Sequence, residues 1–213
     1  MPEIVRSFPF LLQGALITLW LTLASGFFGT IIGTLAGMGR LSAMKALRYP
    51  SSVYVEFIRG TPLLVQIYII YFGLPSLGLD LKPFTAAVVA LTINAGAYTA
   101  EIVRAGIQSI DKGQMEAARS LGMTGWQSMF HVILPQAFRN VLPALGNEFI
   151  ALAKESSLVS VIGIAELTRQ GQYVISRTFK SFEIYGGVAL IYFALTFSMS
   201  QIVGWVEKKV KIP

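Results

Sequence analysis

Two long stretches of the sequence contain no charged residue, and they constrain the fold more than any other feature. The first covers residues 7–39 and the second covers residues 184–206. About 20 apolar residues in an α-helix cross the hydrocarbon core of a bilayer, so each stretch is long enough to span it. Since a lone span in lipid must satisfy its own backbone hydrogen bonds, both stretches predict transmembrane helices.

The composition supports a membrane protein throughout the chain. The mean hydropathy is +0.63 and only 13% of the 213 residues are charged, whereas soluble domains carry roughly 25%. The chain has no cysteine, which excludes disulfides and thiolate metal sites. The net charge of +6 indicates basic loops beside a membrane and not a nucleic-acid partner.

The apolar segments predict an all-α membrane protein with about five transmembrane helices in a single transmembrane domain, residues 1–213. Charged and turn-forming residues separate the segments. The predicted spans are approximately residues 8–39, 53–74, 83–104, 140–163 and 184–206.

The basic residues between these spans predict the orientation. One side of the bundle holds ten lysines and arginines: Arg40, Lys45, Arg48, Arg104, Lys112, Arg119, Arg139, Lys208, Lys209 and Lys211. The other side holds five, which are Arg6, Lys82, Arg169, Arg177 and Lys180. The positive-inside rule therefore predicts a cytoplasmic C-terminus and an N-terminus outside.

A short polar element lies at the centre of the chain, between the third and fourth predicted spans. Asp111 can cap a helix over about 112–121, and Gly122 can adopt the left-handed conformation that ends it. The expected apolar face carries Met115, Ala118 and Leu121, and Glu116 and Arg119 lie on another face. Two interpretations stay open: a helix lying on lipid headgroups, or a plug for a cytoplasmic partner.

Polar side chains inside two predicted spans form helical stripes. Asn94, Tyr98 and Glu101 are spaced i, i+4 and i+7, and so are Glu148, Leu152 and Glu155. Ionisable groups in a membrane are costly and commonly line a cavity, which favours a translocation pathway that accepts an ammonium or guanidinium group. The alternative is hydrogen bonding between helices.

Two further patterns concern helix geometry. Glu56 and Arg59, at i and i+3, predict an ion pair, and Pro62 predicts a kink four residues before Gln66. The four-residue spacing of Gly29, Gly33 and Gly37 predicts close packing against another helix, in this chain or in a second copy.

Several motifs, in order along the chain, resemble one family. Glu116-Ala117-Ala118, Gly122 and Ile133-Leu134-Pro135 are similar to the cytoplasmic "EAA" signature of importer-type ABC transporter permeases. The stretches FIRGTPLLVQ (57–66), AYTAEIVRAGIQSI (97–110) and KESSLVSVIGIAEL (154–167) resemble the polar amino acid permeases of that superfamily. The resemblance covers nearly the whole chain.

The resemblance implies a translocation subunit of a bacterial inner-membrane importer. The central helix is then a coupling helix that docks into an ATPase subunit through Met115, Glu116, Ala117, Ala118, Arg119, Leu121 and Gly122, and the bend near Gln66 lines the pore or gate. The implied partners are two cytoplasmic ATPase subunits, a second permease chain (a homodimer or a heterodimer with a paralogue) and an extracytoplasmic solute-binding protein.

The chain is not expected to be an enzyme. No G-x-x-x-x-G-K-[ST] motif occurs in the sequence, so ATP and Mg²⁺ are expected on the partner ATPase. We expect neither a cofactor nor a metal site, nor a catalytic constellation. The carboxylates of the fourth span favour arginine, lysine or histidine as substrate. The alternative class is a secondary transporter or channel subunit that works without ATP, although such folds commonly show internal repeats, and none is evident here.

Overall fold

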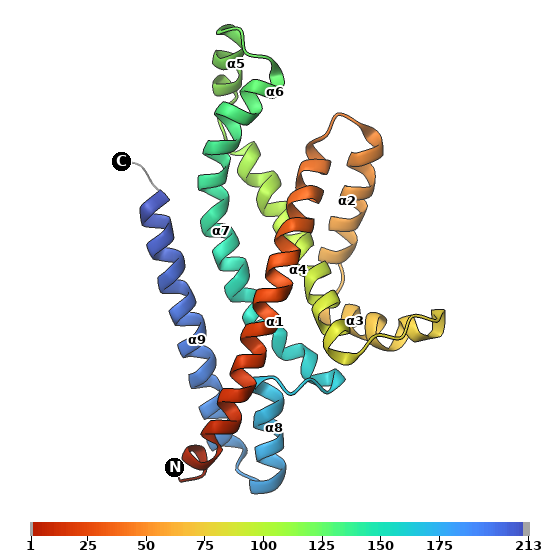
Figure 1. The fold of residues 1–213 in the computed structure, drawn as a ribbon, viewed down its shortest axis with the longest axis vertical. Coiled ribbons are helices and arrows are strands. Elements are labelled where there is room, and N and C mark those ends of the chain that lie inside the picture. The colour runs from red at the N-terminus through yellow and green to blue at the C-terminus, as the bar shows by residue number, and fades with distance from the viewer. Residues whose placement is uncertain (1, 211–213) are drawn as a thin grey trace.

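The computed structural model describes residues 2–210, with side chains from Ser7 onward, and every regular element in that range is helical. Lys211, one of the ten basic residues counted above, lies outside the described range. Figure 1 shows a bundle in which α5 and α6 project from one end, while α8 and the start of α9 lie at the opposite end. The turn between α1 and α2 is directed toward the α5 end, as the predicted orientation requires.

The elements follow one another along the chain with short connections. They are α1 (Pro2–Leu41), α2 (Lys45–Arg59), α3 (Leu63–Tyr68), the π-helix η1 (Ile69–Gly73), the 3₁₀-helix η2 (Leu74–Leu77), α4 (Pro83–Gln108), α5 (Lys112–Ser120), α6 (Gly125–Ser128), the π-helix η3 (Met129–Ile133), α7 (Leu134–Glu155), the 3₁₀-helix η4 (Ser156–Ile162), α8 (Leu167–Thr178) and α9 (Ser181–Val210).

The glycine ridge of α1 packs against α4 within the same chain, which confirms the predicted close packing. A Cβ added to Gly29 would lie 2.9 Å from the Ala95 side chain, and one added to Gly37 would lie 2.7 Å from the Ala100 carbonyl oxygen. The two backbones approach so closely because neither face presents a large side chain at these positions.

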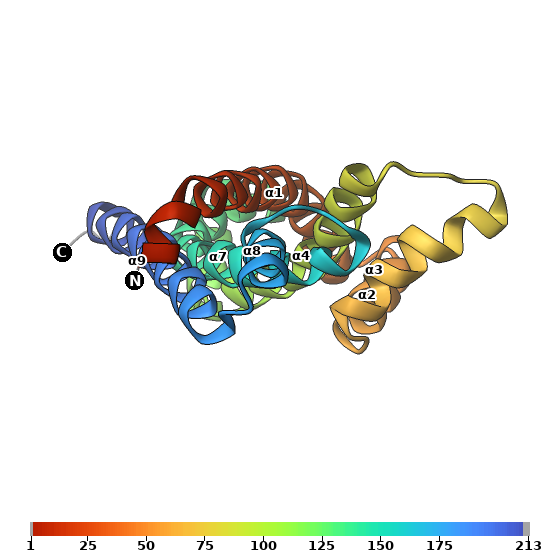
Figure 2. The same ribbon diagram turned by 90° about the horizontal axis from the view of Figure 1, so that it is seen from below.

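The predicted second span, residues 53–74, is broken into two helices. α2 ends at Arg59, α3 begins at Leu63, and the two form an angle of 106°. Pro62 is the N-cap of α3. It cannot donate the backbone hydrogen bond that a continuous helix would need, which explains the predicted kink. α3, η1 and η2 extend sideways from the bundle (Figure 2).

The helical segment that contains the predicted fourth span, 140–163, begins well before that span. The chain is helical from Gly125 to Ile162, changing from α6 through η3 to α7 and then to η4. Pro135 has no N–H to donate to the His131 carbonyl, which explains the π-helical turn at the start of α7.

Three described helices are long and apolar enough to cross a bilayer: Ser7–Leu41, Pro83–Gln108 and Ser181–Val210. The bent pair α2–α3 would make a fourth. α7 is not among them, because it combines the apolar residues with Arg139, Glu148, Lys154 and Glu155. The count of five spans therefore stays a prediction.

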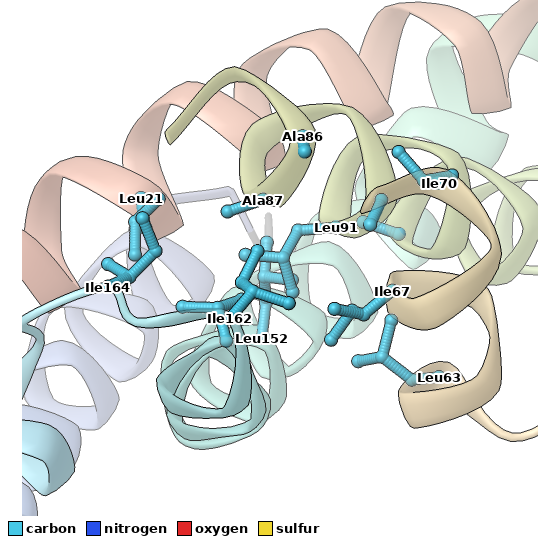
Figure 3. Close-up of a cluster of buried hydrophobic side chains, with 13 residues drawn as sticks. Leu21, Leu63, Ile67, Ile70, Ala86, Ala87, Leu91, Leu152, Ile162 and Ile164 are labelled. Carbon is cyan, nitrogen blue, oxygen red and sulfur yellow. The ribbon is translucent and has the colours of Figure 1, made fainter. Parts of the chain in front are cut away.

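A cluster of buried apolar side chains joins α1, α3, α4 and α7 at the level of the α2–α3 break (Figure 3). Leu21, Ile67, Leu91 and Leu152 are each at most 1% exposed. At the far end of the bundle, the buried Glu166 caps α8 through the N–H groups of Thr168 and Arg169 and accepts a hydrogen bond of 2.9 Å from the Tyr192 hydroxyl of α9.

Candidate functional site

The cytoplasmic loop predicted around residues 111–122 has the expected helix and caps. α5 begins after Asp111, whose carboxylate accepts a 2.7 Å hydrogen bond from the N–H of Gly113. At the other end Gly122 has φ +87°. The Gly122 N–H donates to the Arg119 carbonyl at 3.0 Å and the Met123 N–H donates to the Ala118 carbonyl at 3.2 Å. This pair of bonds is a Schellman motif, which confirms the predicted role of Gly122.

The faces of α5 differ in part from the prediction. Ala118 is buried and Met115 is half-buried in a cleft formed with Met129 and Ile133. Leu121 was expected on the same face but is 83% exposed. The helix ends at Ser120, so Leu121 is the C-cap residue and leaves the helical stripe. Glu116, Ala117 and Arg119 are exposed and available to a partner.

The sequence prediction missed a second short helix in this loop. α6 begins with a capping box, in which Thr124 Oγ1 accepts from the N–H of Gln127 at 3.3 Å and Gln127 Oε1 accepts from the N–H of Thr124 at 2.8 Å. The signal was present as T-x-x-Q. Trp126 and Phe130 pack their rings with centroids 4.3 Å apart and remain exposed.

Gln66 and Asn94, both predicted to line the pathway, are buried and bonded to each other. Asn94 Nδ2 donates to Gln66 Oε1 at 3.0 Å, and Gln66 Nε2 donates to the carbonyl oxygens of Ile58 at 2.8 Å and Thr61 at 3.1 Å. The Ile58 carbonyl lies in the last turn of α2 and the Thr61 carbonyl lies between α2 and α3. At this break a continuous helix no longer supplies their hydrogen bonds. The two amides therefore hold the broken helix against α4.

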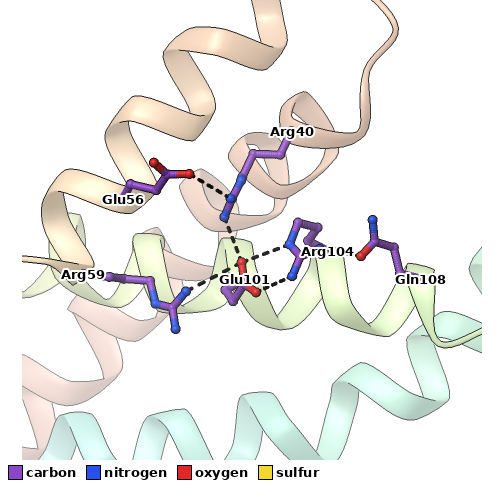
Figure 4. A network of polar contacts seen from close by, with 6 residues as sticks. All are labelled: Arg40, Glu56, Arg59, Glu101, Arg104 and Gln108. Carbon is purple, nitrogen blue, oxygen red and sulfur yellow. Dashed lines mark hydrogen bonds and ion pairs between the residues drawn. The ribbon is translucent and has the colours of Figure 1, made fainter.

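Glu101 is the centre of an ionic cluster in the half of α4 that leads to α5 (Figure 4). Its carboxylate contacts Arg40 of α1 at 2.8 Å, Arg59 of α2 at 3.6 Å, and Arg104 one turn along α4. The Arg59 guanidinium also lies 5.4 Å from the centre of the Tyr98 ring. Glu101 thus connects α4 to α1 and α2 through ion pairs, which is a structural role.

The predicted ion pair between Glu56 and Arg59 is wrong. Glu56 contacts Arg40 at 3.5 Å, and Arg59 contacts Glu101. Arg59 is the last residue of α2, so its long side chain reaches the half-buried carboxylate of Glu101 in preference to the exposed Glu56.

Close contacts with three helices fix the rotation of α7. Val141 packs where Gly106 of α4 leaves room, Phe149 packs on Gly26 of α1, and Gly146 admits Val203 of α9. Val141, Glu148, Leu152 and Glu155 share one helical face. This face is directed toward α4, because Val141 contacts α4 and Leu152 lies in the core.

The two carboxylates on this face have no partner. Between Ser7 and Val210, no side chain or backbone group makes a hydrogen bond or salt bridge with Glu148 or Glu155, although both are half-buried. Their electrostatic neighbours are each other, Arg59 near Glu148, and Lys154 near Glu155. Leu152, which is 0% exposed, does not face an open space in this structure.

An all-helical membrane bundle with a helix-turn loop at one end has the architecture of a membrane-spanning transport subunit. Residues 29–212 match the family described as "Binding-protein-dependent transport system inner membrane component". The chain belongs to this family and is a permease subunit of an amino acid ABC importer.

Individual relatives agree on this class and differ in the substrate they are named for. The chain is 46% identical to the glutamine transport system permease protein GlnP of Escherichia coli (strain K12), over 96% of this chain and 94% of the relative. It is 41% identical to the arginine transport system permease protein ArtQ of Bacillus subtilis (strain 168), over 97% and 95%. A crystal structure of an amino acid ABC transporter with histidines has a TM-score of 0.93 and 48% identity, over 96% of both chains.

Proposed function

We propose that this permease carries polar or basic amino acids, with arginine, lysine or histidine favoured, along a pathway at the α4-facing side of α7 in the bacterial inner membrane. The observation that supports it is the pair of half-buried carboxylates, Glu148 and Glu155, which lack partners in the described chain. An unpaired carboxylate in a water-poor site is costly, so a cationic ligand that pairs with it gains affinity.

Local charges support a cationic substrate more than an anionic one. Glu148 and Glu155 lie two turns apart on the same face of α7. Arg59 is the cation that interacts electrostatically with Glu148. Arg59 is partly engaged by Glu101, but 40% of its side chain remains accessible to a substrate's α-carboxylate. Glutamine remains the second candidate, because the relatives include glutamine permeases.

The other predicted pathway residues have a different part in this proposal. Gln66 and Asn94 hold the α2–α3 break, and Leu152 packs in the core. The Arg59 guanidinium lies over the Tyr98 ring and forms an ion pair with Glu101. Tyr98 and Glu101 would therefore position Arg59 at the edge of the pathway. Glu148 and Glu155 would contact the substrate.

The exposed α5 loop and the small number of spans in one chain support an assembly with several subunits. The single domain of residues 1–213, with its N-terminus outside, would pair with a second permease chain, most simply a copy of itself. Each coupling helix would dock into one of two cytoplasmic ATPase subunits, which bind ATP and Mg²⁺ and carry out the hydrolysis. An extracytoplasmic solute-binding protein would deliver the amino acid to the opposite end.

Uptake into vesicles that contain the complete transporter tests the proposal. Radiolabelled arginine, glutamine and glutamate are compared with and without ATP, in the unmodified protein and in Glu148→Gln and Glu155→Gln. Lys154→Gln is the matched control on the same helix. We expect ATP-dependent arginine uptake that the two glutamate variants reduce selectively.

Other outcomes would contradict distinct parts of the proposal. Strong glutamate uptake by the unmodified protein would contradict the assignment of a cationic substrate. An equal loss of uptake for all three amino acids in both glutamate variants would assign Glu148 and Glu155 a structural role. Uptake that persists when only the ATPase is omitted would contradict ATP coupling.

A further inference from the structure

One left-handed backbone position in this chain is occupied by phenylalanine. Four described residues have a left-handed φ between +56° and +87°, namely Gly78, Gly122, Gly163 and Phe179. Glycine adopts this conformation without steric cost, whereas a bulky side chain does so with strain. Phe179 therefore stands where the rest of the chain uses glycine, at the C-cap of α8.

The Phe179 ring does not offset this strain through contacts within the chain. It is 87% exposed, and Phe182, three residues further on, is 93% exposed. Figure 1 shows the connection between α8 and α9 at the end of the bundle opposite α5. Two large apolar rings are thus presented outward on one turn.

Two exposed aromatic residues of α9 indicate the depth of this turn relative to a bilayer. Tyr185 and Trp205 are 20 residues apart, about 30 Å along an α-helix, which matches the hydrocarbon thickness of a bilayer. Tyrosine and tryptophan concentrate at the two membrane interfaces. The Lys209 ammonium lies 3.9 Å from the centre of the Trp205 ring, as expected at the cytoplasmic interface.

The same scale places the α8–α9 turn in the outer headgroup layer. Phe182 precedes Tyr185 by one turn, about 4.5 Å along the helix. It also continues the exposed stripe of Gly186, Ala189 and Phe193 on α9, which is the least buried of the three candidate spans. The turn is therefore continuous with the apolar face that α9 leaves exposed in this chain.

The turn also carries cations suited to lipid phosphates. Among side chains of residues 7–210, none makes a hydrogen bond or ion pair with Arg177. Arg177 lines a cleft of about 380 Å³ between α1 and α8, together with Phe10 and Tyr173. The Lys180 ammonium has only a weak ion pair with Glu183, at 3.9 Å.

We propose that the α8–α9 turn is an outer-leaflet membrane anchor, in which Phe179 and Phe182 insert at the lipid interface and Arg177 and Lys180 bind phospholipid phosphate. Arginine binds phosphate through charge-assisted hydrogen bonds. The apolar rings fit the acyl boundary just below the headgroups. A solute-binding protein is the other conceivable partner, but the continuity with the apolar stripe of α9 favours lipid.

Spin labels test the depth of the turn. Because the chain lacks cysteine, Phe179→Cys and Phe182→Cys can be labelled singly in the full transporter, assembled with cysteine-free partner subunits in phosphatidylethanolamine–phosphatidylglycerol vesicles. Phe193→Cys provides the hydrocarbon reference and Lys45→Cys the aqueous reference. The measured quantity is the accessibility of each label to oxygen divided by its accessibility to a water-soluble nickel reagent. We expect this ratio to rise in the order 45, 179, 182, 193, and to be several-fold higher at 182 than at 45.

Three results would overturn the anchor. The first is an accessibility ratio at 179 and 182 equal to that at 45. The second is shielding of both labels from both reagents that occurs only when the solute-binding protein is added, which would make the turn a protein contact. The third concerns charge. Arg177→Glu should move the label at 182 toward water, and Arg177→Lys should not. The same label depth in both variants would contradict the contact between Arg177 and phosphate.

Discussion

Acidic residues of the bundle differ in whether they form ion pairs. Glu101 contacts three arginines contributed by α1, α2 and α4. Glu148 and Glu155 on α7 are half-buried but make no hydrogen bond or salt bridge within the described chain. The difference separates a carboxylate that holds helices together from carboxylates that remain available to a ligand.

This difference could not be seen in the sequence. Glu101 ends one i, i+4, i+7 stripe within an apolar span and Glu148 begins another, and both stripes predict a pathway equally well. The distinction depends on Arg40 and Arg59, which are distant in sequence from Glu101. Only the packing of α1 and α2 against α4 brings Arg40 and Arg59 into contact with Glu101. Arg59 and Lys154 act on Glu148 and Glu155 only at longer range and form no ion pair with them.

The largest expected effect comes from neutralising Glu101. Glu101→Gln leaves three guanidinium groups facing one another. We expect a loss of about 2–3 kcal/mol in stability, because several charge-assisted contacts are lost together. The loss stays below the range for a fully buried pair, because Glu101 is partly exposed. Thermal unfolding of the purified transporter would show it. The matched variant Glu148→Gln should change stability by no more than about 0.5 kcal/mol. Equal losses in both variants would remove the distinction between the two sites.

Gln66→Leu should cost about 2 kcal/mol, because the carbonyls of Ile58 and Thr61 and the amide of Asn94 then lose a buried partner. Gln66→Glu keeps the size but places a carboxylate against the two carbonyl oxygens, so it should be destabilising as well. If thermal unfolding shows Gln66→Leu to be neutral while its transport is lost, Gln66 belongs to the pathway and not to the helix break.

The loop with the proposed coupling helix α5 extends the comparison to the end of the molecule where Glu116, Ala117 and Arg119 are exposed. Gly122→Val should cost about 1–2 kcal/mol in the left-handed conformation, weakening ATPase binding roughly tenfold, and Gly122→Ala should cost less. Affinity for the ATPase subunit, measured with purified components, tests this. The bundle should keep its unfolding temperature, and a Gly122→Val variant that binds and transports normally would contradict the coupling assignment.

Local patterns in the sequence predicted local structure well. Asp111 and Gly122 mark the ends of α5, the glycine ridge packs on α4, and Pro62 breaks the second span. Each depends on backbone conformation within a few residues. Leu121 was misplaced because the helix ends one residue earlier than expected, and the Glu56–Arg59 pair was wrong because a partner from another helix was available.

Binding of arginine to the purified transporter, without solute-binding protein, tests the central claim most directly. Equilibrium binding of labelled arginine and glutamine would be measured for the unmodified protein, Glu148→Gln, Glu155→Gln and the control Lys154→Gln. We expect arginine to bind in preference to glutamine. Each glutamate variant should weaken arginine binding roughly tenfold or more, because one charge-assisted contact is lost. Lys154→Gln should leave arginine binding unchanged. Arginine affinity that is the same in all four proteins would contradict the role of the two carboxylates.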